Sequence, residues 1–280
     1  MRSGDGVGGP ERFEAVSSDG ARVRGIRRPG PGETLVLVHG VAMDTRIWGE
    51  SGFLDALPGV DVVALDLRGR GESEHVGSAA RHAVDRYVED VQAVLDLFPR
   101  QRYSVFGTYF GGRVALQAAA ADARVARAFS FCAHGEAVDI PAGAVEEEAS
   151  AIEGPDGHAY LRDHFTEVGA PPWMIEACDR VDQGELAAAT RGLLYGSGSG
   201  VERRNPDQDL VLVTADGDSD LTTFRTSEKR LGARLWLVDS PSRVRAAARL
   251  AEVGRRVADT LDAPVDASPG TVRTAGREGG

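Results

Sequence analysis

The chain has 280 residues, of which 42% are hydrophobic, and a formal net charge of −11 at pH 7. This length predicts one large α/β domain with an insertion, and the acidic charge argues against nucleic acid or an anionic membrane as a partner. The two cysteines, Cys132 and Cys178, are too few and too distant for a disulfide framework or a zinc site, and Cys132 is expected to be a buried thiol.

The N-terminal segment lacks the apolar run of a signal peptide. Residues 1–10 are polar and glycine-rich, and no run in the sequence approaches the length of a membrane span. We therefore expect a cytoplasmic protein. Residues 264–280 contain Pro, Gly, Ser and Thr with little apolar content, which predicts a disordered tail.

Strands and helices alternate along the chain. Residues 13–16 and 23–27 are predicted to be two short strands that form a hairpin. Apolar runs typical of buried parallel strands follow at 34–38, 61–65, 103–106, 125–132, 209–214 and 234–238. Helices are predicted at 47–57, 82–97, 114–120 and 244–261. This order predicts an α/β fold with a mostly parallel sheet flanked by helices.

One long segment interrupts this alternation. Residues 135–206 are rich in Ala and Glu, have helical stretches and show no strand pattern. We expect them to form an inserted helical lid, and lids of this kind cover small-molecule pockets. The predicted organisation is a core α/β domain at 1–134 and 207–263, the lid at 135–206, and the disordered tail at 264–280.

A tyrosine stands in a glycine frame between a predicted strand and a predicted helix. The run is Val105-Phe106-Gly107-Thr108-Tyr109-Phe110-Gly111-Gly112. Its pattern, G-x-Nu-x-G, is that of the nucleophile elbow, a tight turn between a strand and a helix. Tyr109 alone in this run has a glycine two positions away on both sides, so it should occupy the strained central position.

With two further motifs, this run resembles the α/β-hydrolase-fold proteins. The motifs are Leu35-Val36-Leu37-Val38-His39-Gly40 and Asp66-Leu67-Arg68-Gly69-Arg70-Gly71-Glu72-Ser73, each at the end of a predicted strand. The match extends from about residue 34 to residue 261, without the lid. It implies that Tyr109 stands where the family usually has a serine, and that Arg68 and Arg70 have structural roles.

The resemblance also implies an oxyanion hole formed by the backbone N–H groups of Val41 and Phe110, which needs no particular side chain. The residues expected to line the pocket beside it are His39, Gly40, Asp44, Trp48 and Thr108. The alternatives are a structural role for His39 and core or surface positions for Asp44 and Trp48.

The family also has an acid after a late strand and a histidine after the last strand. Asp218 fits the acid. No histidine follows His164 in this chain, so the family histidine is absent and ordinary Ser-His-Asp acyl transfer is not expected. His134, after the predicted strand at 125–132, would either reach the cavity and pair with Tyr109 or be a solvated loop residue.

Neither a metal nor a cofactor is expected. The acidic loop around Asp218 lacks the glycine and the final glutamate of a calcium-binding loop. The glycine-rich stretches lack the strand and helix context of a nucleotide fingerprint. His158 and His164 fall in the predicted lid, where surface positions are expected.

A tyrosine hydroxyl has an ordinary pKa of about 10, so at neutral pH it donates hydrogen bonds and can act as a general acid. The favoured hypothesis is a non-hydrolytic lyase, cyclase or isomerase acting on a small apolar substrate of the secondary-metabolite kind. Tyr109 would move a proton while the hole stabilises an oxyanion. The alternatives are a non-catalytic protein that binds a ligand or partner, and a rewired hydrolase with His134 as its base. The oligomeric state is open.

Overall fold

The computed structural model describes residues 9–262 except 197 and 203–204, so the predicted tail at 264–280 lies outside the described residues. An eight-stranded sheet has the order β1-β2-β4-β3-β5-β6-β7-β8. The strands are β1 (Glu11–Val16), β2 (Arg22–Arg28), β3 (Thr34–Val38), β4 (Asp61–Leu65), β5 (Tyr103–Thr108), β6 (Val125–Phe131), β7 (Asp209–Ala215) and β8 (Arg234–Val238). The β1–β2 and β2–β4 pairs are antiparallel and all others are parallel. The predicted α/β fold with a mostly parallel sheet is confirmed.

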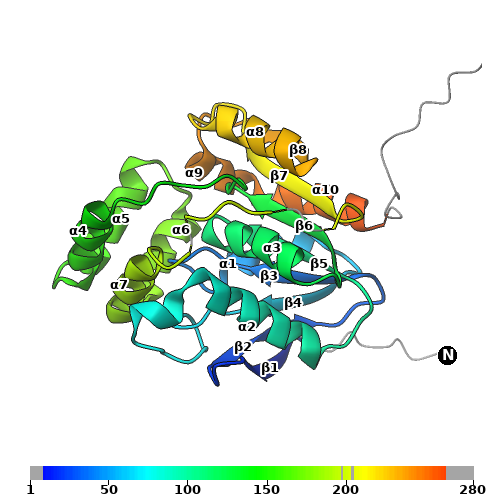
Figure 1. Cartoon of the computed structure of the whole chain (residues 1–280), viewed down its shortest axis with the longest axis horizontal. Coiled ribbons are helices and arrows are strands. Elements are labelled where there is room, and N and C mark those ends of the chain that lie inside the picture. Colours follow the sequence, from blue (N-terminus) through cyan, green and yellow to red (C-terminus); the bar gives the residue numbers. More distant parts are fainter. Residues whose placement is uncertain (1–8, 197, 203–204, 263–280) are drawn as a thin grey trace, which may run out of the picture.

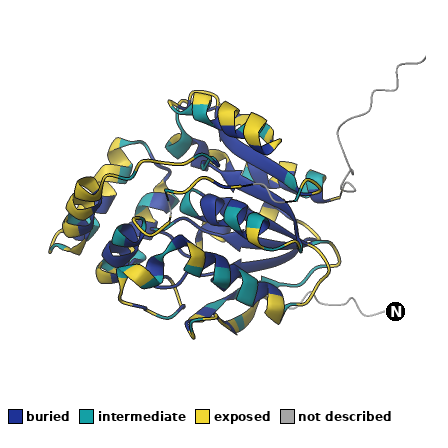
Figure 2. Cartoon of the chain, in the orientation of Figure 1, coloured by how far each residue is buried: buried dark blue, intermediate teal, exposed yellow. Residues whose placement is uncertain are grey.

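Helices cover both faces of the sheet (Figure 1). On one face pack α2 (Val84–Leu97), α3 (Phe110–Ala121) and α8 (Leu221–Leu231), and on the other α1 (Ile47–Glu50), α9 (Arg243–Ala246) and α10 (Leu250–Leu261). Short 3-10 helices are η1 (Leu54–Ala56), η2 (Ala79–His82), η3 (Cys178–Arg180) and η4 (Ala247–Arg249). The central strands β3 to β6 are buried along their whole length, as expected when both faces are covered (Figure 2).

The predicted helices differ from the observed ones where the backbone leaves helical geometry. The helix expected at 47–57 is split into α1 and η1 because Gly52, between them, has φ +71°. Helix α8 was not predicted at all. Its sequence gives a weak signal, since only Phe224, Ser227 and Leu231 of its eleven residues are buried.

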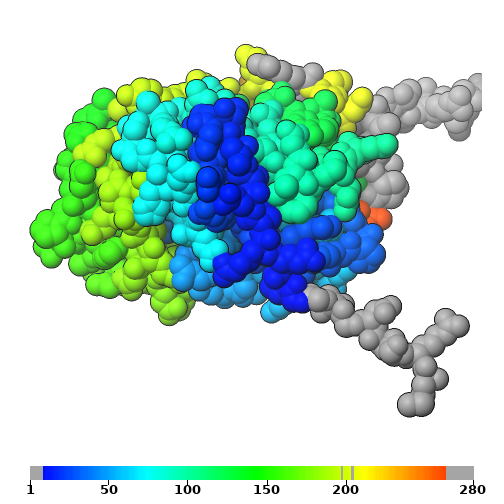
Figure 3. Space-filling view, turned by 90° about the horizontal axis from the view of Figure 1, so that it is seen from below, coloured from blue at the N-terminus to red at the C-terminus, as the bar shows by residue number. Residues whose placement is uncertain are grey.

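The segment predicted as a lid is helical. Between β6 and β7 the chain forms α4 (Ala142–Glu153), α5 (Gly157–Glu167), α6 (Pro172–Ala177), η3 and α7 (Gln183–Gly192), which we call the helical insertion. It has a small apolar core of its own, which includes Ile152, Leu161 and Leu186. The insertion lies at one end of the molecule, whereas β1 and β2 cross the surface seen in Figure 3. None of the described helices has the length and apolar character needed to cross a membrane.

A buried histidine joins the insertion to the core. In His82 of η2, Nε2 lies 3.0 Å from Glu185 Oε2 of α7, and Nδ1 lies 2.6 Å from the Tyr87 hydroxyl. Glu185 Oε1 accepts the Gly77 N–H at 2.7 Å. Burial lowers the pKa of His82 to about 4, with the Arg70 charge as a second cause, while Glu185 acts in the opposite direction. The imidazole is therefore neutral at pH 7.

This pKa predicts a pH dependence of stability. Between about pH 4 and pH 6.5 the unfolded chain protonates His82 and the folded chain does not, so stability is complete above pH 6.5 and falls as the pH decreases. From pH 7 to pH 5 this one group should remove about 2 kcal/mol of unfolding free energy. Urea unfolding at pH 7 and pH 5 should show a smaller loss of unfolding free energy in His82→Gln than in the wild-type protein. Equal losses in both proteins would contradict the assignment of this pH dependence to His82.

Candidate functional site

Tyr109 forms the turn between β5 and α3. Its backbone has φ +53° and ψ −117°, a conformation that costs a residue with a side chain about 1–3 kcal/mol. Its N–H donates to the Phe131 carbonyl on the neighbouring strand at 2.7 Å, and its carbonyl accepts the Arg113 N–H at 3.1 Å. The strained turn is therefore held by the sheet on one side and by the helix on the other.

Gly107 and Gly111 allow this turn to close. A Cβ on Gly107 would lie 2.0 Å from the Gly111 carbonyl oxygen, and one on Gly111 would lie 2.2 Å from the Val38 carbonyl and 2.4 Å from that of His39. No side chain fits at such distances from backbone atoms. The two glycines therefore bring the end of β3 against the N-terminus of α3.

His39 fixes the loop that follows β3. Its buried ring lies with Nε2 3.0 Å from the Leu67 nitrogen and Nδ1 2.7 Å from the Gly40 carbonyl. Because Nε2 accepts the Leu67 N–H, the proton is on Nδ1 and is donated to Gly40. Burial lowers the pKa of His39 and keeps it neutral. These contacts give His39 a structural role in the loop.

Two backbone N–H groups were predicted to form the oxyanion hole, that of Val41 in the loop after β3 and that of Phe110, the residue after Tyr109. Phe110 is the first residue of α3, so its N–H has no partner inside the helix. Within the described part of the chain, neither this group nor the Val41 N–H has an acceptor. The Val41 carbonyl accepts a hydrogen bond from Arg70 Nε, which holds the loop from its other side. Both N–H groups thus have unused hydrogen-bonding capacity within the described residues.

Asp218 follows β7 and is paired with Arg243, which follows β8. Asp218 Oδ1 lies 2.9 Å from Arg243 Nη2 and 3.1 Å from its Nε. The carboxylate also accepts from the Thr214 hydroxyl at 2.5 Å and from the Asp220 N–H at 2.9 Å. This buried carboxylate is thus held by a cation and two neutral donors, and among the described residues no hydrogen bond joins it to Tyr109.

Arg243 also meets the turn at Tyr109. The Tyr109 hydroxyl donates to the Arg243 carbonyl at 3.2 Å, and Cys132 Sγ donates to the same oxygen at 3.3 Å. Among the described non-glycine residues, Tyr109 and Cys132 are the two with positive φ, and they follow the neighbouring strands β5 and β6. Sequence analysis missed Arg243. The available signal is that it is the first basic residue after β8, in the segment where the family would have a histidine.

Burial keeps both of these side chains protonated. It raises the pKa of the Tyr109 phenol well above its ordinary value near 10, with the neighbouring Cys132 and Asp218 adding to the shift and Arg243 opposing it. It also raises the pKa of the Cys132 thiol well above its ordinary value near 9. At neutral pH the two groups are donors and weak acids, and neither is an anionic nucleophile.

His134 contacts the N-terminal part of α8. Its Nε2 lies 3.2 Å from Asp220 Oδ2, and its Nδ1 accepts the Glu136 N–H at 3.2 Å. Burial lowers the pKa of His134. In the insertion, the His158 ring bonds to a backbone carbonyl at 3.0 Å and His164 is exposed. No contact joins any of these imidazoles to Tyr109 among the residues that the structure describes.

The other residues expected in the pocket separate into core and cavity positions. Trp48 is buried against Phe53 and Phe106, with ring centroids 5.3 and 5.9 Å away. Thr108 is fully buried at the end of β5, and its hydroxyl has no hydrogen-bond partner among the residues that the structure describes. Asp44 is buried but lines two neighbouring cavities, of about 250 and 410 Å³. Neither of these two cavities is lined by Tyr109.

Nothing in the described residues points to a metal centre. Within residues 9–262, apart from the three undescribed positions, no three His, Cys, Asp or Glu side chains gather in a way that would hold an ion. Asp216 accepts the Ser240 N–H at 3.0 Å and so ties the β7 and β8 loops together.

Comparisons with known proteins agree with this architecture. The model of the family described as alpha/beta hydrolase fold matches residues 33–152. A similar solved structure is that of the bottromycin epimerase BotH in complex with bottromycin A2. Its chain is 71% identical in sequence to this one, and the two structures superpose with a TM-score of 0.89 over 90% of this chain and 99% of that one. The chain belongs to the α/β-hydrolase superfamily. This confirms the family predicted from the three sequence motifs.

More distant members share the superfamily fold. The enol-lactonase from Burkholderia xenovorans LB400 is 18% identical with a TM-score of 0.73, covering 89% of this chain and 99% of that one. The esterase EaEST from Exiguobacterium antarcticum is 12% identical with a TM-score of 0.74, covering 90% and 99%. None of the curated proteins compared with the sequence matches it.

Proposed function

We propose that this protein is a non-hydrolytic isomerase, an epimerase that inverts one carbon centre of a bottromycin-like ligand. The observation that carries the proposal is the 71% identity to the bottromycin epimerase BotH, solved with bottromycin A2, over 90% of this chain. Of the lyase, cyclase and isomerase chemistries left open by the sequence, this identity favours the isomerase. The helical insertion then acts as a lid over the ligand.

In this proposal the superfamily scaffold stabilises an enolate. A solvent water molecule accepts the proton of a carbon next to a carbonyl group, and the electron pair of the broken C–H bond moves onto the carbonyl oxygen. The N–H groups of Val41 and Phe110 donate to that oxygen and stabilise its charge. Tyr109 gives its phenolic proton to the opposite face of the carbon, and the proton that the carbon lost returns to the phenolate through solvent. The nearby Arg243 cation favours that phenolate.

The contacts of the site support isomerisation over hydrolysis. Tyr109 replaces the serine that the superfamily usually has at the turn, and Arg243 takes the place of the histidine beside Asp218. A guanidinium cannot accept a proton at neutral pH, so it cannot activate a hydroxyl or a water. The rewired hydrolase would need His134 as its base, but both ring nitrogens of His134 already have partners.

A non-catalytic ligand-binding protein is the second candidate. Its supporting observation is that the Tyr109 hydroxyl is bonded to the Arg243 carbonyl and lines neither of the two cavities. In that case the phenol fills the site of the lost nucleophile and the ligand binds without reacting.

Product analysis separates these functions. The protein is incubated with bottromycin A2 and the recovered material is resolved by chiral chromatography and mass spectrometry. An epimerase gives a diastereomer of unchanged mass, in an amount that grows with enzyme concentration. Unchanged ligand, recovered together with a thermal shift on binding, supports the second candidate. A product heavier by one water contradicts both.

A further inference from the structure

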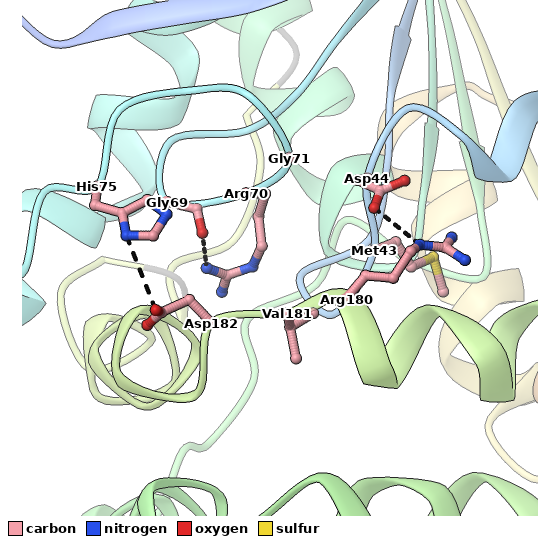
Figure 4. Close-up of a pocket in the computed structure, with 9 residues that line it drawn as sticks. All are labelled: Met43, Asp44, Gly69, Arg70, Gly71, His75, Arg180, Val181 and Asp182. Carbon is pink, nitrogen blue, oxygen red and sulfur yellow. Dashed lines mark hydrogen bonds and ion pairs between the residues drawn. The ribbon is translucent and has the colours of Figure 1, made fainter.

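The smaller cavity lies between the core and the helical insertion, next to the loop after β3. Its volume is about 250 Å³. It is lined by Met43, Asp44, Gly69, Arg70, Gly71, His75, Arg180, Val181 and Asp182 (Figure 4). Met43, Asp44, Gly69 and Arg70 form a buried floor, whereas Gly71, His75 and Asp182 are exposed at the rim. We call it the Arg70 cavity.

Arg70 is a buried cation that lacks a full set of partners. Its side chain is only 2% exposed. Its Nε donates to the Val41 carbonyl and its Nη1 to the Gly69 carbonyl at 2.7 Å, both neutral acceptors. Its Nη2 is buried and has no hydrogen-bond partner in the described part of the chain. In Figure 4 the guanidinium reaches toward Val181 and Asp182 on the opposite wall.

The carboxylates around the Arg70 cavity pair with side chains other than Arg70. Asp44 bonds to Arg180 at 3.1 Å and to Arg46 at 2.6 Å. Asp182 lies 4.0 Å from His75. The insertion's Glu185, which lies behind this wall, uses both oxygens on His82 and a backbone N–H. Burial lowers the pKa of Arg70, and Tyr87, Glu185 and Asp182 oppose that shift only in part.

A buried charge without an ionic partner costs free energy, and an anion that enters the cavity recovers it. We propose that the Arg70 cavity binds a carboxylate group of the ligand, with Arg70 Nη2 as its charged donor. Asp44 on the floor and Asp182 at the rim add negative charge on both sides, which favours a monoanion over a phosphate dianion. The cavity volume fits a small group and not a whole ligand.

The location of the cavity connects this anion to the proposed reaction. Arg70 holds the Val41 carbonyl, and the same loop carries the Val41 N–H of the oxyanion hole. A carboxylate on Arg70 would therefore anchor the ligand beside the reacting carbonyl. The assignment rests on the proposed function for this role, and it narrows the substrate class to carboxylate-bearing ligands. Binding of the carboxylate itself requires no turnover.

The test uses benzoate, its neutral counterpart benzamide, and inorganic phosphate, titrated into the full chain by calorimetry. Benzoate should bind at least about tenfold more tightly than benzamide or phosphate. Arg70→Met should lose benzoate binding, whereas Arg46→Gln, which alters an exposed arginine on the same Asp44, should retain it within about threefold. Equal affinity for benzoate and benzamide, tighter binding of phosphate, or unchanged binding in Arg70→Met would overturn the proposal.

A second measurement does not depend on how the variant folds. Crystals of the unmodified protein soaked with benzoate should place a carboxylate oxygen within hydrogen-bonding distance of Arg70 Nη2. Benzoate bound at any other position would overturn the assignment. Because no turnover is measured, these results are independent of the epimerase assay. Carboxylate binding in the Arg70 cavity can be disproved while epimerase activity is found, and epimerase activity can be absent while the carboxylate binds.

Discussion

Replacing Tyr109 with phenylalanine is expected to lower the rate of epimerisation about a hundredfold or more, because the proposed proton donor is lost. The ring and its packing against Phe131, at a centroid distance of 5.9 Å, are kept. Ligand affinity should therefore change by less than about threefold. Turnover is measured by product analysis. The dissociation constant is measured separately, by calorimetry at a low temperature at which turnover is slow.

A matched control for this change is Tyr160→Phe. Tyr160 lies on α5 of the helical insertion and is 39% exposed, so the loss of its hydroxyl should leave both turnover and binding unchanged. If Tyr109→Phe turned over ligand at the wild-type rate, the phenol would serve only for packing at the turn. Another residue would then have to be the proton donor.

A methyl group on Gly111 is expected to destabilise the fold strongly, because it would press on the backbone at the end of β3. Gly111→Ala places a Cβ 2.2 Å from the Val38 carbonyl and 2.4 Å from the His39 carbonyl, and backbone atoms cannot move aside cheaply. The cost should be about 3 kcal/mol or more of unfolding free energy. For a domain of this size, that lowers the melting temperature by roughly 6–12 °C.

The comparison for Gly111→Ala is Gly143→Ala on α4. A Cβ at Gly143 would meet nothing within 4 Å, so the change should leave stability equal or raise it slightly, since alanine favours helix over glycine. Scanning calorimetry of both variants decides the matter. Equal melting temperatures for the two would show that β3 and α3 can separate, and the close approach that positions Val41 and Phe110 would lose its support.

The sequence was most informative where local chemistry determines the structure. The apolar runs at 34–38 and 61–65 coincide with β3 and β4, which are buried along their whole length because both faces of the sheet are covered there. The glycine frame located the strained turn, since only glycine tolerates the contacts at Gly107 and Gly111. Motif order then identified the superfamily.

Contacts between side chains that are distant in the sequence could not be predicted from local motifs. Arg243 is separated from Tyr109 in the sequence by three strands and the whole helical insertion. Its contact with Tyr109 uses a backbone carbonyl, which every residue type has, so the residue type gives no signal of it. Its ion pair with Asp218 depends on the relative position of two loops. Arg70 could not be singled out from the sequence either, because it lies in a motif whose expected role is structural. That its Nη2 lacks a hydrogen-bond partner can be seen only when the positions of the neighbouring carboxylates are known.

The proton at the inverted carbon gives the most direct test of the account. The protein is incubated with bottromycin A2 in deuterium oxide, and the ligand is recovered and examined by mass spectrometry and NMR. The account predicts that each molecule of the new diastereomer carries one deuterium, at the inverted carbon, with no bond cleaved. Ligand recovered without deuterium and without inversion, or a hydrolysed product, would contradict it.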